Sequence, residues 1–183
     1  MTKLSAFAVV ILLSACTAAV VPVRVTSSPN ITATTTQMRV RISGTEKAQL
    51  TRGAVAEGAL GTKWLIDARD ALTSAVRTAI PEGDARAPAL DIQVRDFDVD
   101  WSAQKAGGVS ELTIHAIVQI DYDLQTEASR HTGSVVGRGR HVDTGWGPKI
   151  DQRIGANIDR VVGDAIGAAM RDLVTDLERL QRE

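Results

Sequence analysis

The sequence predicts an α+β domain in which an antiparallel sheet of about four strands carries two helices on one face. Three observations predict this class. Apolar and polar residues alternate along four segments, as they do in half-buried strands. In two other segments, apolar residues recur every three or four positions, as on one side of a helix. The segments follow the order strand, helix, three strands, helix, and consecutive strands of this kind usually pair antiparallel.

The first strand and the first helix are expected in residues 37–43 and 63–80. Alternation places three apolar residues on one face of the strand, Met38, Val40 and Ile42. Gly44 ends this strand. The helical spacing is carried by Trp64, Leu65, Ala68, Leu72, Val76 and Ile80. Thr62 can cap the helix and Pro81 stops it, because the residue before a proline avoids the helical conformation.

The second and third strands are expected in residues 90–101 and 112–124, joined through a turn at residues 107–108. In the second strand the apolar positions change face, from Leu90, Ile92 and Val94 to Phe97, Val99 and Trp101. A bulge near Arg95 and Asp96 would return both sets to one side. The third strand alternates without a fault over its whole length, which is the firmest strand pattern in the chain.

A fourth strand is expected in residues 132–142, although it contains Gly133, Gly137 and Gly139, and glycine weakens strand interiors. The last element is a long helix over residues 150–180, with apolar residues spaced by three and four. Its apolar side is broader than one stripe, because four further residues widen it: Val162, Ile166, Met170 and Val174. We expect this helix to cover the sheet and still to leave apolar surface for a partner.

The N-terminus has the layout of a signal peptide. Lys3 precedes an apolar stretch over residues 4–13, which is too short to span a bilayer of about 30 Å. Cys16, the only cysteine, closes the run Leu13-Ser14-Ala15-Cys16. This run resembles the signal of a bacterial lipoprotein, in which the chain is cut before the cysteine and the thiol carries diacylglycerol. The alternative is an ordinary secretory signal with an incidental or buried cysteine.

The lipoprotein interpretation divides the chain into a signal peptide of residues 1–15, a lipidated Cys16 with a tether over residues 16–36, and a single α+β domain over residues 37–183. The tether is rich in Thr, Ser and Pro, which favours a solvated linker over an added edge strand. Thr17, not Asp, follows the cysteine, which resembles the default of export to the outer membrane in Gram-negative lipoproteins. We expect a stable lipid anchor at the periplasmic face of the outer membrane.

Composition argues against several classes of protein. The 21 Lys and Arg residues against 22 Asp and Glu residues give a net charge of -1, without the basic surplus of a nucleic-acid binder. The lone cysteine leaves no internal disulfide, so the fold must rest on packing. Beyond residue 15, no apolar run approaches the roughly 20 residues of a transmembrane helix. We expect no nucleic-acid partner and lipid as the only membrane attachment.

Enzyme motifs are not found. Asp96, Asp98 and Asp100 alternate on a strand and could gather a divalent cation, but the run does not fit an EF-hand loop. A solvated acidic face is the simpler interpretation, in which these aspartates, together with Asp121 and Asp123, pair across strands with arginines: Arg39, Arg41, Arg138 and Arg140. The three histidines lack the spacing of a zinc site: His115, His131 and His141. Serine-nucleophile and dinucleotide-binding motifs do not occur. We therefore expect no enzymatic activity, no metal and no cofactor.

A partner-binding surface is the remaining functional candidate. Tryptophan is enriched at binding hot spots, so Trp101 and Trp146, at strand and loop ends, are candidates, with edge-of-core packing as the alternative. The broad side of the last helix adds Val162, Ile166, Met170 and Val174. Gly163 and Gly167 would let another backbone approach this helix, either in a homodimer or where the helix rests on its own sheet or sister helix.

The lipobox cysteine, the segment 25–31 leading into the strand 38–44, the helix 64–80 and the C-terminal helix together resemble the YajG family of enterobacterial-type lipoproteins. The same order of elements resembles auxiliary lipoproteins of lipid-transport ABC systems and, more distantly, the lipoprotein plug of the lipopolysaccharide export channel. The resemblance implies a non-enzymatic envelope lipoprotein. We expect an outer-membrane protein that binds an unidentified envelope protein through its free sheet face or long helix. The alternative is an auxiliary component of a lipid or lipopolysaccharide transport system.

Overall fold

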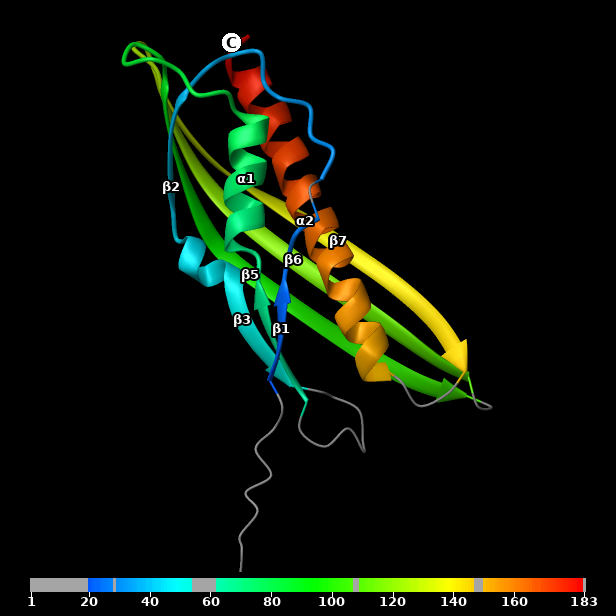
Figure 1. The fold of residues 1–183 in the computed structure, drawn as a ribbon. Coiled ribbons are helices and arrows are strands. Elements are labelled where there is room, and N and C mark those ends of the chain that lie inside the picture. Colours follow the sequence, from blue (N-terminus) through cyan, green and yellow to red (C-terminus); the bar gives the residue numbers. More distant parts are fainter. Residues whose placement is uncertain (1–19, 28, 54–61, 107–108, 147–149, 183) are drawn as a thin grey trace, which may run out of the picture.

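The computed structural model describes residues 20–27, 29–53, 62–106, 109–146 and 150–182 (Figure 1). The expected signal peptide, Cys16 and the expected turn at residues 107–108 lie outside this part. The strands are β1 (Val20–Arg24), β2 (Arg39–Ser43), β3 (Gln49–Gly53), β4 (Lys63–Asp67), β5 (Ala89–Ala106), β6 (Val109–Gln125) and β7 (Arg130–Trp146). The helices are α1 (Arg69–Ala79) and α2 (Ile150–Leu180), and a 3-10 turn, η1 (Thr45–Ala48), precedes β3.

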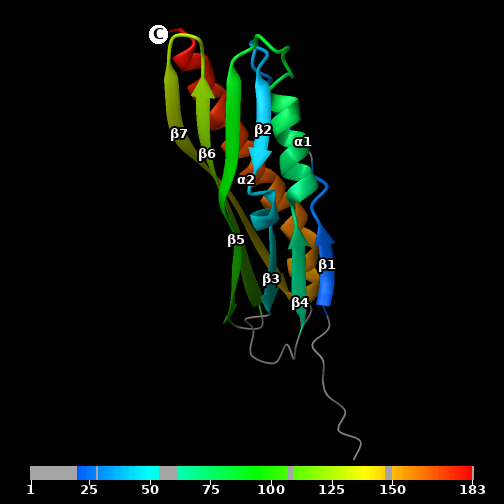
Figure 2. The same ribbon diagram turned by 90° about the vertical axis from the view of Figure 1, so that its left-hand side faces the viewer.

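These elements confirm the α+β class and form two sheets. A long sheet has the order β2-β5-β6-β7, and a small sheet has the order β1-β4-β3. Both helices lie on one face of the long sheet, as expected, and the small sheet lies beside them at one end of the molecule (Figures 1 and 2). The small sheet was not expected, and it completes the layer that covers the long sheet. Within the described residues, no helix is long and apolar enough to cross a membrane.

The expectation of a wholly antiparallel sheet is wrong at one edge. Strands β5, β6 and β7 pair antiparallel, but β2 pairs parallel with β5. The physical reason is the connection between them. The chain leaves β2, passes through the small sheet and α1, and returns in the original direction, and such a crossover produces a parallel pair. The consecutive long strands instead follow one another antiparallel, as hairpins do.

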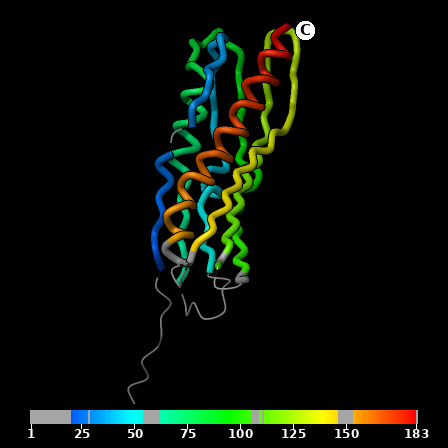
Figure 3. The backbone as a smooth tube through the Cα atoms, turned by 90° about the vertical axis from the view of Figure 1, so that its right-hand side faces the viewer, coloured from blue at the N-terminus to red at the C-terminus, as the bar shows by residue number. Residues whose placement is uncertain are grey.

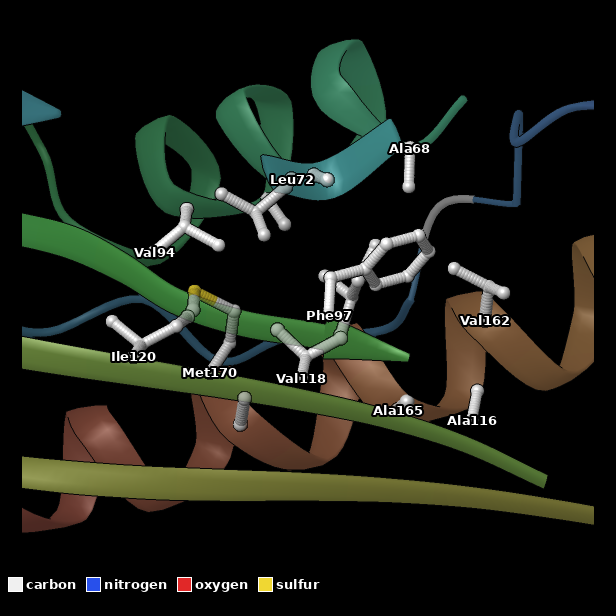
Figure 4. Close-up of a cluster of buried hydrophobic side chains, with 14 of the residues drawn as sticks. Ala68, Leu72, Val94, Phe97, Ala116, Val118, Ile120, Val162, Ala165 and Met170 are labelled. Carbon is white, nitrogen blue, oxygen red and sulfur yellow. The ribbon is translucent and has the colours of Figure 1, made fainter. Parts of the chain in front are cut away.

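The expected bulge and the alternation of the third strand are both confirmed. The pairing register between β5 and β6 shifts between Val94 and Asp96, so both apolar sets of β5 point toward the helices. Every second residue of β6 from Leu112 to Leu124 is buried. These side chains meet those of α1 and α2 in one core, in which Leu72, Phe97 and Met170 converge (Figure 4).

The helix expected over residues 63–80 is wrong in its first part. Residues 63–67 form β4, with Trp64 and Ile66 buried and Leu65 half-buried, and α1 begins only at Arg69. Short apolar runs satisfy the helical and the strand period equally well, and here the pairing of β4 with strands on both sides decides. The Asp67 carboxylate accepts a hydrogen bond from the Arg69 backbone N–H (3.2 Å), at the point where the helix starts.

The tether expected over residues 16–36 is also wrong from Val20 onward. An added edge strand was the less favoured alternative to a solvated linker. Such a strand is present as β1, which pairs parallel with β4. The chain then crosses the helices as a segment that we name the strap, residues 25–27 and 29–36. Val25 and Thr34 of the strap are buried. Its partners lie far along the chain, from Asp67 and Ala79 to Asp159, and a local Ser/Thr/Pro composition gives no sign of them.

The strap is fastened to α2 by one carboxylate. Asp159 accepts hydrogen bonds from the backbone N–H groups of Thr26 (2.7 Å) and Ser27 (3.0 Å) and from the hydroxyl of Ser27 (2.8 Å). Burial raises the pKa of Asp159, but these hydrogen bonds together outweigh burial and leave the pKa below its usual range. Asp159 therefore holds the strap best when it is ionised.

This carboxylate makes stability depend on pH. Because the folded pKa of Asp159 lies below that of the unfolded chain, its contribution is complete above about pH 4 and disappears as the pH falls through the folded value. We expect Asp159→Asn to lower the free energy of unfolding by about 1 to 3 kcal/mol at neutral pH and by less in acid, in urea titrations. The exposed Asp164→Asn, also on α2, should change it by less than about 0.5 kcal/mol. A loss of stability in Asp159→Asn that did not change with pH would contradict the stabilising role of the ionised Asp159 carboxylate.

Glycines allow α2 to lie very close to its neighbours on two sides. On the sheet side, a Cβ at Gly137 of β7 would lie 1.9 Å from the carbonyl oxygen of Ala165, and one at Gly139 would lie 2.0 Å from that of Val161. Only glycine lets the helix axis come so near the strand, and α2 runs beside β6 and β7 along the molecule (Figure 3). On its other side, Gly163 packs against Ser27 of the strap.

Candidate partner-binding surface

The residues expected to bind a partner on the last helix lie in the core. Val162, Ile166 and Met170 are fully buried and Val174 is 7 % exposed. Met170 and Val162 point into the cluster around Val118 and Phe97 (Figure 4). The apolar side of α2 is broad because it is covered from several directions, by the long sheet, α1 and the strap, and not because surface is left over. Gly163 and Gly167 likewise face the strap, at Ser27 and Pro29.

The two tryptophans have different positions. Trp101, on the inner face of β5, is 5 % exposed and contacts Trp64 of β4 edge to face, with ring centroids 5.2 Å apart and planes at 81°. This contact joins the two sheets, so Trp101 belongs to the core and not to a contact surface. Trp146 is the last residue of β7, and its side chain lies outside the described residues.

No described element covers the face of the long sheet turned away from the helices, which we name the outer face (Figure 2). Its polar side chains follow from strand alternation, because the apolar residues of β6 from Leu112 to Leu124 point inward. The pairing registers place residues of β5, β6 and β7 opposite one another in rows across the sheet, so that each strand contributes one column. One row holds Asp100, His115 and Arg140, and the next holds Asp98, Ile117 and Arg138. Acidic groups thus lie along β5 and basic groups along β7.

The register separates charges that the sequence had suggested as pairs. Neighbouring strands lie about 4.8 Å apart, so Arg138 and Arg140 stand about 10 Å from the aspartates of β5. Asp98 pairs instead with Arg52 from β3. Among the described residues, no acidic side chain forms an ion pair with Arg138 or Arg140. The basic column of the outer face is therefore available to a partner.

The acidic column does not form a metal site. Asp100 accepts a hydrogen bond from the backbone N–H of Trp101 (2.8 Å), and Asp98 is engaged with Arg52. No group of three or more His, Cys, Asp or Glu side chains within the described ranges could hold a metal ion. His115 is exposed and His131 and His141 are half-exposed, each in a separate row of the long sheet.

A shallow groove of about 710 Å³ occupies the other half of the outer face, toward β2. Two ion pairs flank it, Arg41 with Asp91 (Nε to Oδ1, 3.5 Å) and Arg130 with Asp123 (Nη2 to Oδ2, 2.5 Å). The hydrogen bond from Arg130 holds the pKa of Asp123 below its usual value. Other polar side chains complete the lining: Ser43, Gln93, Asp121, Thr132 and Ser134. Such a lining can exchange hydrogen bonds with a polar ligand or with the loops of another protein.

Sequence reasoning named a free sheet face but did not place its residues. Asp121 and Asp123 alternate on β6 and Thr132 and Ser134 alternate on β7, so the sequence indicates that each pair shares one face. Which residues stand opposite one another depends on turn lengths and on the bulge of β5. The arrangement of the columns and the groove is therefore a result of the register.

No protein-family model and no curated protein sequence matches the chain. Among solved structures, the rare lipoprotein B from Shewanella oneidensis is similar with a TM-score of 0.46 and 12 % identity, over 79 % of this chain and 98 % of that one. A minor lipoprotein from Acinetobacter baumannii is similar with a TM-score of 0.35 and 7 % identity, over 80 % of this chain and 94 % of that one. At these scores, neither structure bears on the function of this chain.

Proposed function

We propose that the chain is a non-catalytic lipoprotein of the outer membrane, anchored through Cys16 at its periplasmic face, that binds another envelope protein through its outer face. The observation that carries the proposal is the order of Lys3, an apolar stretch and Leu13-Ser14-Ala15-Cys16 at the N-terminus. This is the order of elements that cleavage and acylation at a cysteine require, and the lone thiol stands at the cleavage position.

The choice of surface rests on burial and charge. The long helix, which was the other candidate, has its apolar residues in the core. The outer face is uncovered, holds the partly exposed Ile117 and Val142, and separates acidic from basic groups over three strands. Separated columns of charge favour one orientation of the partner over others. A partner that places basic groups over β5 and acidic groups over β7 is attracted, and the same partner turned around is repelled.

In-cell photocrosslinking tests this surface. A photoreactive residue at Ile117 on the outer face should capture a discrete partner, whereas one at Thr175, on the exposed side of α2, should not. The charge reversal Arg138→Glu with Arg140→Glu should reduce the yield from Ile117 about tenfold or more. The same variant should unfold within about 0.5 kcal/mol of the native protein, because both side chains are exposed. Capture from Thr175 alone, or capture unaffected by the reversal, would contradict the proposal.

A role in lipid or lipopolysaccharide transport is the alternative function. Such a role requires apolar surface that acyl chains can occupy. The groove on the outer face is lined mainly by charged, hydroxyl and amide side chains, its large apolar residues Ile92 and Tyr122 are buried, and the apolar residues of α2 lie in the core. These features favour protein binding over lipid transfer. Phospholipid or lipopolysaccharide that stayed bound to the protein in native mass spectra would favour transport instead.

A further inference from the structure

The covalent distance from the lipid to the domain is short. Strand β1 begins at Val20, and only three residues separate Val20 from Cys16. An extended chain spans at most about 3.6 Å per residue, so the two Cα atoms lie within about 14 Å of each other. A tether that extended to residue 36 would instead have let the domain move and turn freely at a much larger distance.

Strand β1 is held firmly, so the tether is not lengthened by peeling it away. All five of its residues pair in register with β4, and the Val25 backbone N–H continues the pairing to the Asp67 carbonyl oxygen (2.9 Å). The strap that follows has Val25 buried and its next two residues bound by Asp159. The point at which the anchor leaves the domain is therefore fixed.

The two ends of the elongated molecule differ in character. Strands β1 and β4 begin at the end opposite the C-terminus, where β3 ends and α2 begins (Figures 1 and 3). At this end Val20 is 54 % exposed and Val21 is 41 % exposed, and the exposed Lys63 stands opposite Val20. The other end carries exposed charged residues in its connections: Glu82, Asp84, Arg86 and Glu127. The exposed valines and the lysine around the start of β1 suit lipid headgroups, which attract cations and accept apolar side chains.

We propose that the acylated protein stands on the bilayer with the start of β1 against the headgroups and its opposite end directed away from the membrane. This inference rests on the proposed acylation of Cys16. Val20, Val21 and Lys63 make the contact, and the partner is a phospholipid surface. Strand β6 has 17 residues, so the connection after it lies up to about 55 Å further from the membrane than its start. The outer face then runs upright and is accessible from the side.

Fluorescence quenching measures this orientation. The acylated full-length protein is labelled at a single introduced cysteine, Gly53→Cys beside the start of β4 or Glu127→Cys at the far end, since acylated Cys16 has no free thiol. Both positions are exposed, and an added side chain at Gly53 meets nothing within 4 Å. The protein is reconstituted into vesicles of phosphatidylethanolamine and phosphatidylglycerol that contain headgroup-quencher lipid. We expect several-fold stronger quenching at Gly53→Cys than at Glu127→Cys.

A tether variant is the matched control. About 30 Gly and Ser residues inserted between Ala18 and Ala19 give a flexible linker with a mean span of about 30 Å, and the ratio of quenching should fall to about one. Equal quenching in the native-length protein, stronger quenching at Glu127→Cys, or a ratio that the linker leaves unchanged would overturn the inference. The mass and the vesicle flotation of the same samples distinguish the proposed acylation from the proposed orientation. An acylated protein that floats with the vesicles but shows equal quenching overturns only the orientation. An unacylated protein overturns both.

Discussion

Replacing Gly137 with alanine is expected to lower the free energy of unfolding by about 3 kcal/mol or more. The added Cβ would lie 1.9 Å from the carbonyl oxygen of Ala165 and 2.5 Å from the backbone nitrogen of Ala169. Both atoms belong to the backbone of α2, which no rotamer change can move aside. The helix must therefore shift away from β7, and the core beneath both elements loses contacts along with it.

Gly53→Ala is the matched control for this prediction. Gly53 also lies in a strand, but a Cβ there meets nothing within 4 Å. Alanine at this position restricts the unfolded chain, so stability should stay the same or rise slightly. Urea unfolding of the two variants measures the difference directly. A loss below about 1 kcal/mol for Gly137→Ala would mean that α2 does not rest on β7 as closely as described.

Replacing Cys16 with serine is expected to abolish the lipid-bearing mature protein and remove the chain from the outer-membrane fraction. The thiol is the atom to which diacylglycerol would be attached, and a serine hydroxyl does not replace it in this class of signal. A protein without acyl chains has no stable membrane attachment of the kind that two or more chains provide. Separation of inner and outer membranes followed by immunoblotting measures the effect.

Two changes at the next position serve as controls for the serine variant. Thr17→Ala keeps the cysteine and should leave the protein in the outer membrane. Thr17→Asp should keep the acyl chains but retain the protein in the inner membrane, if the resemblance to Gram-negative lipoproteins extends to sorting. An outer-membrane protein that remained in place after Cys16→Ser would contradict anchoring through this residue.

The elements that the sequence predicted well are those with long, uninterrupted patterns. Strand β6 alternates over thirteen residues from Leu112 to Leu124, and α2 repeats its apolar residues from Ile150 to Leu180, which are also its observed bounds. Over such lengths only one period fits the pattern. The bulge of β5 was predictable for the same reason, because a change of face in a long strand must be corrected near one position, between Val94 and Asp96.

The small sheet could not be predicted because each of its strands has five residues. Around β4, Trp64, Ala68 and Leu72 fit one helix, while Trp64 and Ile66 fit a strand, and the neighbouring strands β1 and β3 decide between the two. The strap was missed for a related reason. Its hydrogen bonds to Asp159 join residues more than 130 positions apart, and no local pattern records such a partner.

The candidate surface was predicted only in part. The broad apolar side of α2 predicted surface left over for a partner, but this side is covered by the long sheet and α1, which were expected, and by the strap, which had been assigned to a linker. The free sheet face followed correctly from alternation in β6. Its columns of charge did not, because Arg138 reaches its row beside Ile117 and Asp98 only through the observed registers.

Mass spectrometry of the N-terminal peptide, from protein purified from its native cells, tests acylation at Cys16 most directly. We expect a peptide that begins at Cys16 and carries a diacylglyceryl thioether together with an amide-linked acyl chain. A peptide that begins at Met1, or one in which Cys16 has a free thiol, would contradict it.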